Sequence, residues 1–275
     1  MQIGDFDFYH EFLEERCGLT LREDQTYILQ SRLGPISKQW GFETIEDMTI
    51  SLRALPDVTL IAAIIGAMSN TETAFFRDHK PFLYLEEKAL PELGHKKNIF
   101  KPLRIWSAGC ASGQEAYSLA MICARSRKHL KTMIGSPAYT IWATDVCETA
   151  LHQAHKGHYT QSEVQNGLPS SYMMKFCKQK DQGWSIADKI KKTITFEEHN
   201  LLDTVIQPAS FSVIFCRYVL GSMSSRACNF ILERFAALLP KDGYLFLGTQ
   251  ENIQNTILDE MFGAVPHHTG IYKRL

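Results

Sequence analysis

The chain has 275 residues, of which 45% are hydrophobic, 21% charged and 11% aromatic, and its formal net charge is -1. This composition excludes a disordered, collagen-like or coiled-coil protein, and the lack of a basic excess excludes a general nucleic-acid binder. Residues 1–80 carry 7 basic and 13 acidic side chains, whereas the remainder carries 22 and 17. The length permits one large domain or two modest ones, and the uneven charge favours two.

The seven cysteines form no CxxC pair, and several lie in apolar runs. We therefore expect free thiols in a reducing compartment, without a disulfide framework or a metal site. The chain starts without the basic and apolar regions of a signal peptide. Its longest apolar stretch, around residues 60–68, is far shorter than the ~20 residues that span a bilayer. These features predict a cytoplasmic protein without membrane insertion.

The first eighty residues have helical periodicity. Apolar residues recur at helical spacing between residues 6 and 36, although Pro35 is expected to kink or restart its helix. Thr44 and Asp57 each stand in the position of a helix N-cap. No strand pattern occurs in this part. We predict an all-helical N-terminal domain and linker over residues 1–78.

Beyond about residue 100, strand-like apolar runs alternate with helical segments. The expected strands are 103–108, 139–144, 211–215 and 244–247, and the expected helices are 115–125, 148–156 and 227–239. Strands that alternate with helices predict a doubly wound, mostly parallel α/β sheet. We predict that this second domain spans residues 79–275.

A long polar stretch, residues 158–198, separates the second expected strand from the third. Within it, residues 184–186 and 193–196 alternate in polarity like a small antiparallel insertion, and Asp181-Gln182-Gly183 has the composition of a turn. We predict a small β-subdomain inserted at about residues 158–198.

Two strand ends carry candidate ligand-binding residues, because open α/β sheets bind ligands beyond the carboxyl ends of their strands. The first strand ends in Gly109-Cys110-Ala111-Ser112-Gly113, which allows a ligand close to the backbone but also fits an ordinary tight turn. The second strand ends at Asp145, which either accepts hydrogen bonds from a ribose or caps the next helix. The G-x-G-x-x-G fingerprint is absent, which counts against a nicotinamide enzyme.

Five segments, in order along the chain, carry a family resemblance. They are Thr73–Asp78, Trp106–Ser118, Ala143–Asp145, Asn200–Asp203 and Phe215–Arg217, and the similarity continues through Gly248–Glu251 to Gly270–Lys273. Together they resemble the chemotaxis receptor glutamate methyltransferase (CheR) family of bacteria. The resemblance implies a class I S-adenosylmethionine-dependent methyltransferase fold. It also implies that the protein forms methyl esters on glutamate side chains of chemoreceptor cytoplasmic helices during chemotactic adaptation, with S-adenosylhomocysteine as the product.

The resemblance further implies roles for individual residues in holding the cofactor. The linker would reach over it, Glu115 and Asp145 would be its acidic contacts, with Asp145 on the ribose, and further residues would line the adenine and methyl-donor pockets. The residues implied are Thr71, Thr73 and Arg77 in the linker, Gly109 at the first strand end, Asn200 and Leu201 beside the adenine, and Arg217 and Tyr218 at the methyl-donor pocket.

Methyl transfer of this kind needs few catalytic groups. A sulfonium methyl is already activated by the adjacent positive charge, and a glutamate with an ordinary pKa near 4.3 is ionised at neutral pH, so no general base is required. The remaining task is to orient the carboxylate, and a guanidinium does this through two parallel hydrogen bonds. Arg77 is the candidate. The alternative is a surface ion pair between Arg77 and Asp78 or Glu72.

Two positions depart from the family pattern. After the third strand the family usually reads Arg-Asn-Val, then a hydrophobic residue, Ile and Tyr; here Tyr218 replaces the asparagine and Ser222 replaces the tyrosine expected near the transferred methyl. We retain both, with Arg77, as candidate catalytic residues. The departures leave open a degenerate member that binds S-adenosylmethionine or S-adenosylhomocysteine as a signalling module. A small-molecule methyltransferase is a further alternative, which the helical domain and β-subdomain disfavour.

The resemblance also implies partners. These are the chemoreceptor cytoplasmic domain and, as in some family members, a receptor C-terminal peptide at the β-subdomain. The second N-terminal helix keeps Arg32 and Lys38, but it has Gly34-Pro35 where the family often has further basic residues for receptor binding. We expect a monomer.

Overall fold

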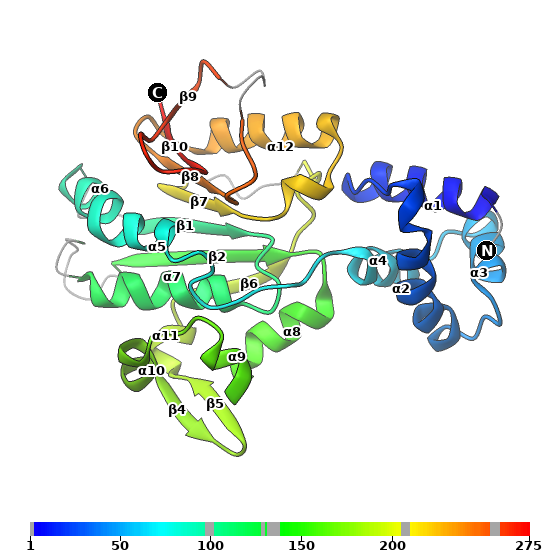
Figure 1. Ribbon diagram of the computed structural model, residues 1–275, viewed down its shortest axis with the longest axis horizontal. Coiled ribbons are helices and arrows are strands. Elements are labelled where there is room, and N and C mark those ends of the chain that lie inside the picture. Colours follow the sequence, from blue (N-terminus) through cyan, green and yellow to red (C-terminus); the bar gives the residue numbers. More distant parts are fainter. Residues whose placement is uncertain (1–2, 97–101, 128–129, 131–137, 205–209, 254–258) are drawn as a thin grey trace.

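A seven-stranded, mostly parallel sheet forms the centre of the larger part of the chain (Figure 1). The computed structural model describes residues 3–96, 102–127, 130, 138–204, 210–253 and 259–275. The strand order is β6-β2-β1-β7-β8-β10-β9, in which β10 pairs antiparallel with both neighbours and the other pairs are parallel. The strands are β1 (Leu103–Ala108), β2 (Tyr139–Asp145), β6 (Ile194–Glu198), β7 (Val213–Cys216), β8 (Tyr244–Leu247), β9 (Phe262–Ala264) and β10 (Ile271–Arg274).

Helices cover both faces of this sheet because successive strand residues point to opposite sides. On β1, Ile105 belongs to the core of one face and Trp106 to the core of the other. The second face packs against α12 (Ser225–Leu238) and the first against a larger set of helices (Figure 1). That set is α5 (Lys80–Tyr84), the π-helix η2 (Leu85–Ala89), α6 (Leu90–Lys96), α7 (Gln114–Arg125) and α8 (Glu148–Lys156). The doubly wound α/β class is confirmed.

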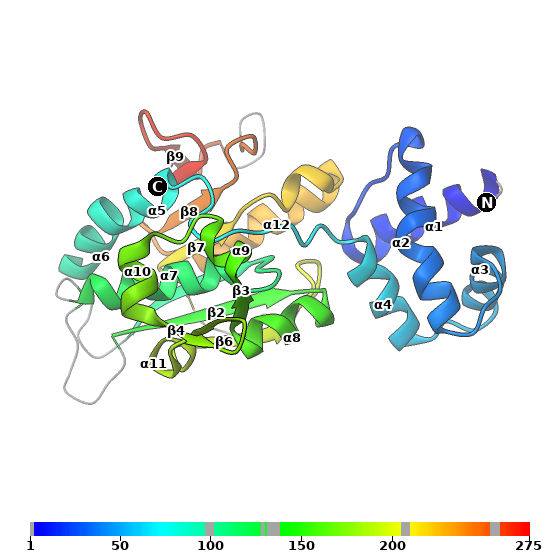
Figure 2. The ribbon, with the colours of Figure 1, turned by 60° about the horizontal axis from the view of Figure 1, so that its bottom comes forward.

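The first seventy residues form a helical bundle with its own core, and Figure 2 shows the linker that leads from it to α5. Its helices are α1 (Ile3–Cys17), the short 3-10 helix η1 (Glu23–Gln25), α2 (Thr26–Gln39), α3 (Ile45–Ala54) and α4 (Val58–Met68). Thr44 and Asp57 cap α3 and α4 as predicted. Of the two alternatives at Pro35, a kink or a restart, the restart does not occur, because α2 continues through Pro35 to Gln39. Gly34 has no Cβ to clash with the proline ring, and buried Leu33 and Ser37 hold the helix on the core.

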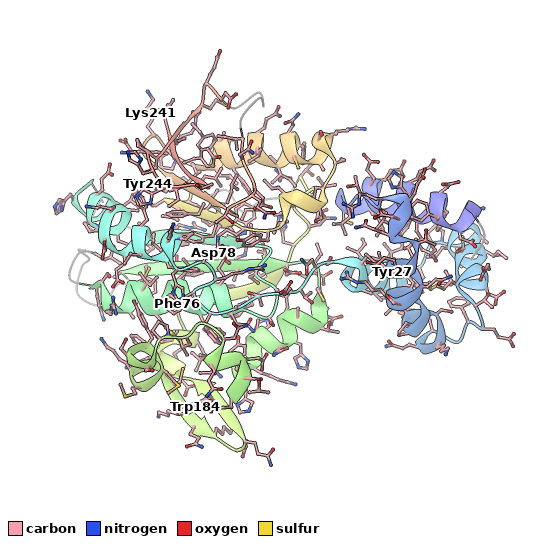
Figure 3. The ribbon with its side chains drawn as sticks, viewed as in Figure 1. Tyr27, Phe76, Asp78, Trp184, Lys241 and Tyr244 are labelled. Carbon is pink, nitrogen blue, oxygen red and sulfur yellow. The ribbon has the colours of Figure 1, made fainter. Side chains whose placement is uncertain are left out.

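The inserted segment forms a three-stranded antiparallel sheet of order β3-β5-β4. It consists of β3 (His158–Thr160), α9 (Gln161–Gln165), α10 (Ser170–Phe176), β4 (Cys177–Lys180), β5 (Gly183–Ile186) and α11 (Asp188–Lys191), and Trp184 marks it in Figure 3. The predicted turn joins β4 to β5. Residues 193–196, however, do not belong to an antiparallel pair: β6 pairs in parallel with β2. An edge strand of the main sheet alternates in polarity as a hairpin strand does. The alternation at residues 193–196 therefore did not distinguish an edge strand from a strand of an antiparallel insertion.

None of the helices in the described ranges combines the length and the apolar content needed to cross a bilayer.

Candidate functional site

The strand order reverses between β1 and β7, and a cleft lies at the carboxyl ends of the strands around this point, as is general for open α/β sheets. The cleft has two adjoining cavities. Asn70, Gly109, Tyr218 and Val219 line both.

The turn between β1 and α7 requires its two glycines. Gly109 has a φ of +76°, and a Cβ placed there would lie 2.4 Å from Cγ2 of Val219. Gly113 has a φ of +92°, and a Cβ there would lie 2.8 Å from Cβ of Ala154. Because both positions combine a left-handed backbone with close neighbours, only glycine lets the turn approach the loop after β7 at position 109 and α8 at position 113.

Asp145 ends β2 and lines the first cavity. Its Oδ2 accepts a hydrogen bond from the backbone N–H of Ala111 at 2.8 Å, and its Oδ1 accepts from that of Cys147 at 2.9 Å. Burial raises the pKa of this carboxyl, although the backbone donors oppose the shift. An ionised carboxylate has about four acceptor sites, more than these backbone donors use, so the side chain fixes two loops and still offers an acceptor to a ligand.

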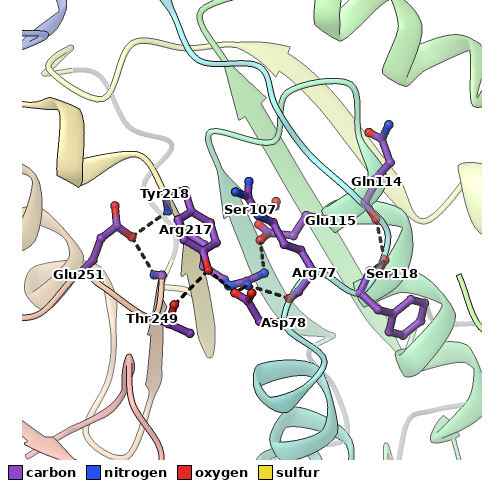
Figure 4. Close-up of polar contacts among 12 residues, drawn as sticks. Arg77, Asp78, Ser107, Gln114, Glu115, Ser118, Arg217, Tyr218, Thr249 and Glu251 are labelled. Atoms are coloured by element: carbon purple, nitrogen blue, oxygen red, sulfur yellow. Dashed lines mark hydrogen bonds and ion pairs between the residues drawn. The ribbon is translucent and has the colours of Figure 1, made fainter. Parts of the chain in front are cut away.

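A chain of charges, in which Arg217 and Glu115 are buried and Asp78 is exposed, joins the second cavity to the linker (Figure 4). Arg217, whose side chain is 1% exposed, contacts Oε2 of Glu115 at 3.2 Å and Oδ2 of Asp78 at 2.5 Å. It also donates to the carbonyl of Arg77 at 2.8 Å. Oε1 of Glu115 accepts from the hydroxyl of Ser107 at 2.8 Å. Burial raises the pKa of the Glu115 carboxyl, although the Arg217 guanidinium opposes this.

The linker is fastened to α7 and places Arg77 at the second cavity. The hydroxyl of Ser118 accepts from the backbone N–H of Phe76 at 3.0 Å. The Arg77 guanidinium lies 3.9 Å from the ring centroid of Tyr218, and its Nη1 donates to the carbonyl of Glu72 at 2.8 Å. Among the described residues Arg77 forms no ion pair with Asp78 or Glu72. The surface ion pair considered from the sequence is therefore not what holds this side chain.

The other predicted residues divide between the cavities. Tyr218 borders both, and Thr73 lines the second; Thr71 is exposed and lines neither. Ser222 lines the first cavity, but its hydroxyl donates to the carbonyl of Val219 at 3.0 Å.

Asn200 and Leu201 also line the first cavity, together with residues of the helical domain. Nδ2 of Asn200 donates to the carbonyl of Arg16 at 2.6 Å, which joins the loop after β6 to the end of α1. The residues expected beside an adenine therefore also connect the two domains.

The sequence did not predict a role at the site for several residues that lie there. Cys17, Leu19 and Asn70 line the first cavity from the helical domain and its linker, and nothing in the sequence indicates a contact across domains. Glu251 lies within a segment that carried the resemblance, but no role was inferred for it. Its carboxylate accepts from the backbone N–H groups of Tyr218, Gly221 and Gly248 at 2.8, 3.0 and 2.7 Å, and so fixes the loop after β7.

The arrangement suits an adenosyl sulfonium such as S-adenosylmethionine. The glycine turn leaves room that a Cβ would fill. Two buried carboxylates, Asp145 and Glu115, line the cavities and can accept hydrogen bonds from hydroxyl or ammonium groups of a ligand. His199, which lines the first cavity, has a buried Nε2 with no partner among the described residues. Within those residues, no cluster of three or more potential metal ligands occurs.

Comparisons with known proteins agree with this geometry. The family model described as "CheR methyltransferase, SAM binding domain" matches residues 71–270. The chain is 34% identical over 274 residues to chemotaxis protein methyltransferase 1 of Pseudomonas aeruginosa, covering 98% of this chain and 97% of that one. It is 33% identical over 254 residues to chemotaxis protein methyltransferase Cher2 of Pseudomonas putida (91% and 92%). It is 32% identical over 276 residues to chemotaxis protein methyltransferase of Vibrio parahaemolyticus (99% and 98%).

Proposed function

The chain belongs to the CheR methyltransferase family and is a chemotaxis methyltransferase with S-adenosylmethionine as cofactor, and from this premise we propose that its substrates are glutamate side chains of chemoreceptor cytoplasmic helices. The observation that carries the proposal is the pair of adjoining cavities. The first offers Asp145 to a ribose, and the second holds the Arg77 guanidinium. A cofactor and a carboxylate substrate can therefore meet where the cavities join, beside Tyr218.

In this proposal, five residues hold the cofactor along the cleft. Asp145 accepts from the ribose hydroxyls, Asn200 and Leu201 flank the adenine, and Glu115 attracts the ammonium of the methionyl part while Arg217 keeps Glu115 in place. When bound, the cofactor supplies a methyl group on a positively charged sulfur.

Arg77 then orients the substrate carboxylate. Of its five N–H donors, one is used on the Glu72 carbonyl, so the others are available to a carboxylate. The carboxylate is already ionised and needs no general base. Correct placement alone can supply roughly 7–11 kcal/mol of barrier reduction, so a site with few catalytic groups is sufficient.

In this proposal, the parts of the molecule outside the cleft bind the receptor. Residues 1–78 form one domain and residues 79–275 the other, and the β-subdomain binds a receptor C-terminal peptide. The chain works as a cytoplasmic monomer. Arg32 is already engaged, because its Nη1 donates to the carbonyls of Met68 and Ser69 at 2.8 and 3.0 Å. Lys38 is exposed on the same helix and is the residue we assign to the acidic receptor surface.

The test is methyl transfer from radiolabelled S-adenosylmethionine to chemoreceptor membranes. The proposal predicts receptor label that mild alkali releases, because carboxyl methyl esters are base-labile, and the Arg77→Ala variant should lose most of it. Cofactor binding without label would instead support a binding module. Label on added free carboxylic acids, but not on receptor, would support a small-molecule methyltransferase.

A further inference from the structure

Tyr218 is fixed at its backbone, its hydroxyl and its ring (Figure 4). Its φ of +62° places it in the left-handed region, which is costly for an aromatic residue. Its backbone N–H donates to Glu251 at 2.8 Å, and its hydroxyl donates to Oδ2 of Asp78. The Arg77 guanidinium covers its ring at 3.9 Å. A strained residue held at so many points is expected where its placement matters.

The hydroxyl of Tyr218 has no proton left for a substrate. A phenol has one O–H donor, and here its hydrogen bond is accepted by Asp78. The hydroxyl of Thr249, 3.2 Å away, can then only donate to the phenol oxygen. The part of Tyr218 that remains to act at the cleft is its ring, which contacts the Arg77 guanidinium at 3.9 Å and, farther away, that of Arg217 at 5.4 Å.

The tilt of the ring is set by an ion pair between buried Arg217 and the more exposed Asp78. Asp78, which accepts from Tyr218, also pairs with Arg217 at 2.5 Å, and Arg217 is anchored in turn on Glu115. Stacking on a ring fixes the plane of a guanidinium and leaves its N–H edge free for a carboxylate. The direction of the Arg77 donors therefore depends on Tyr218 and, through Tyr218, on Asp78.

We propose that Tyr218 is a positioning residue. Its ring, held at a fixed tilt by the hydrogen bond to Asp78, stacks on the Arg77 guanidinium and so directs the N–H donors of Arg77 to the substrate carboxylate. The proposal rests on the proposed function, because it names how that same site orients its substrate. It gives Tyr218, which stands where the family usually has asparagine, a role that needs no contact between its hydroxyl and the substrate.

The chain contains a matched control away from the cleft. The Arg125 guanidinium lies 4.5 Å from the ring centroid of Tyr172, the hydroxyl of Tyr172 donates to Glu86 at 3.1 Å, and Arg125 pairs with Glu86 at 2.6 Å. An arginine again stacks on a tyrosine whose hydroxyl donates to a carboxylate, although here the stacked arginine itself pairs with that carboxylate, and none of the three residues lines either cavity. Tyr172→Phe should leave methyl transfer unchanged.

The first test is a double-mutant cycle between positions 77 and 218, measured as kcat on a chemoreceptor cytoplasmic fragment at saturating cofactor. We expect Arg77→Ala and Tyr218→Leu each to lower kcat by about 100-fold, the scale of a misplaced substrate. The double variant should be no slower than Arg77→Ala alone, because both remove one function. Tyr218→Phe keeps the aromatic ring but removes the hydrogen bond to Asp78 that fixes the tilt of the ring. This variant should lower kcat several-fold and leave the cofactor Kd within about twofold. Additive losses in the double variant would overturn the proposal.

A second readout does not depend on activity. With S-adenosylhomocysteine bound, the Nε–H order parameter of Arg77 by nitrogen relaxation should exceed about 0.6 in the wild type and fall below that value in Tyr218→Leu. Arg125 in the same samples serves as an internal reference and should not change. A mobile Arg77 in the wild type would contradict the proposal. If the wild type labels no receptor while Arg77 is rigid, the proposed function fails, whereas a mobile Arg77 in a wild type that labels receptor overturns the positioning role alone.

Discussion

At the scale of single residues, the cleft keeps two carboxylates under conditions that favour their neutral form. Burial is the main cause of the raised pKa of both Asp145 and Glu115. Keeping such groups ionised costs folding free energy, because a group with a raised folded-state pKa gives stability that is lost as pH rises through that pKa. A ligand that supplies hydroxyl donors or positive charge recovers this cost, which is typical of functional sites.

This electrostatic argument predicts a pH dependence of cofactor affinity. Binding favours the ionised carboxylates, so affinity for S-adenosylhomocysteine should fall as pH drops through the raised pKa values of Glu115 and Asp145, by at most about tenfold per pH unit for each group. The fall should begin above the ordinary values of 4.5 and 3.8. Calorimetric titrations between neutral and acidic pH check this. The Glu115→Gln variant should show a shallower dependence, and an identical slope would remove Glu115 from the binding site.

The two sequence interpretations of Asp145, ribose acceptor and helix cap, can now be separated. We predict that Asp145→Ala weakens S-adenosylhomocysteine binding by about 1.5–3 kcal/mol, the value of hydrogen bonds to a charged group. Asp57→Ala is the matched control, because Asp57 also accepts from two backbone N–H groups, those of Thr59 and Leu60, but lies at the start of α4. The control should lose stability and keep its cofactor affinity. Equal affinities of the two variants would leave Asp145 with a capping role only.

At the scale of elements, the turn from β1 to α7 depends on crowding as well as on backbone conformation. Gly109→Ala should destabilise the protein by about 2–4 kcal/mol and abolish cofactor binding, because its Cβ would meet Val219 in a left-handed residue. Gly41 has a φ of +80°, but a Cβ placed there would have no neighbouring atom within 4 Å. Gly41→Ala should therefore cost only the backbone strain of about 1–2 kcal/mol. Urea unfolding of both variants measures the difference, and equal losses would refute the crowding argument.

The helix α2 gives a second prediction at this scale. Arg32 donates to carbonyls at the end of α4, just before Asn70 enters the cleft, whereas Lys38 is exposed. Arg32→Ala should lower the melting temperature and weaken cofactor binding. Lys38→Ala should leave both unchanged and weaken only binding to the receptor fragment. A normal melting temperature for Arg32→Ala, together with a loss of receptor binding, would reverse these assignments.

At the scale of the whole molecule, the helical domain completes the first cavity. The segment after α1 forms a β-bridge between Leu19 and Met223, and Thr20 donates its backbone N–H to the carbonyl of Ser222 at 3.0 Å. Cys17, Leu19 and Asn70 line the first cavity. Both parts of the chain are therefore needed to enclose a ligand.

The sequence predicted the sheet and the position of Asp145 at a strand end, because strand periodicity and the end of each strand are local features. It did not predict that Asp78 pairs with Arg217, nor that Arg77 stacks on Tyr218, because those contacts join residues about 140 positions apart. It also placed residues 193–196 in the wrong sheet, because alternation alone does not identify the partner strand.

The most direct measurement is mass spectrometry of chemoreceptor peptides after incubation with the protein and S-adenosylmethionine. The account predicts methyl esters on glutamate side chains, removed by mild alkali and nearly absent when Arg77→Ala replaces the wild type. Receptor that stays unmodified, while calorimetry shows that the wild type binds S-adenosylhomocysteine, would contradict the account.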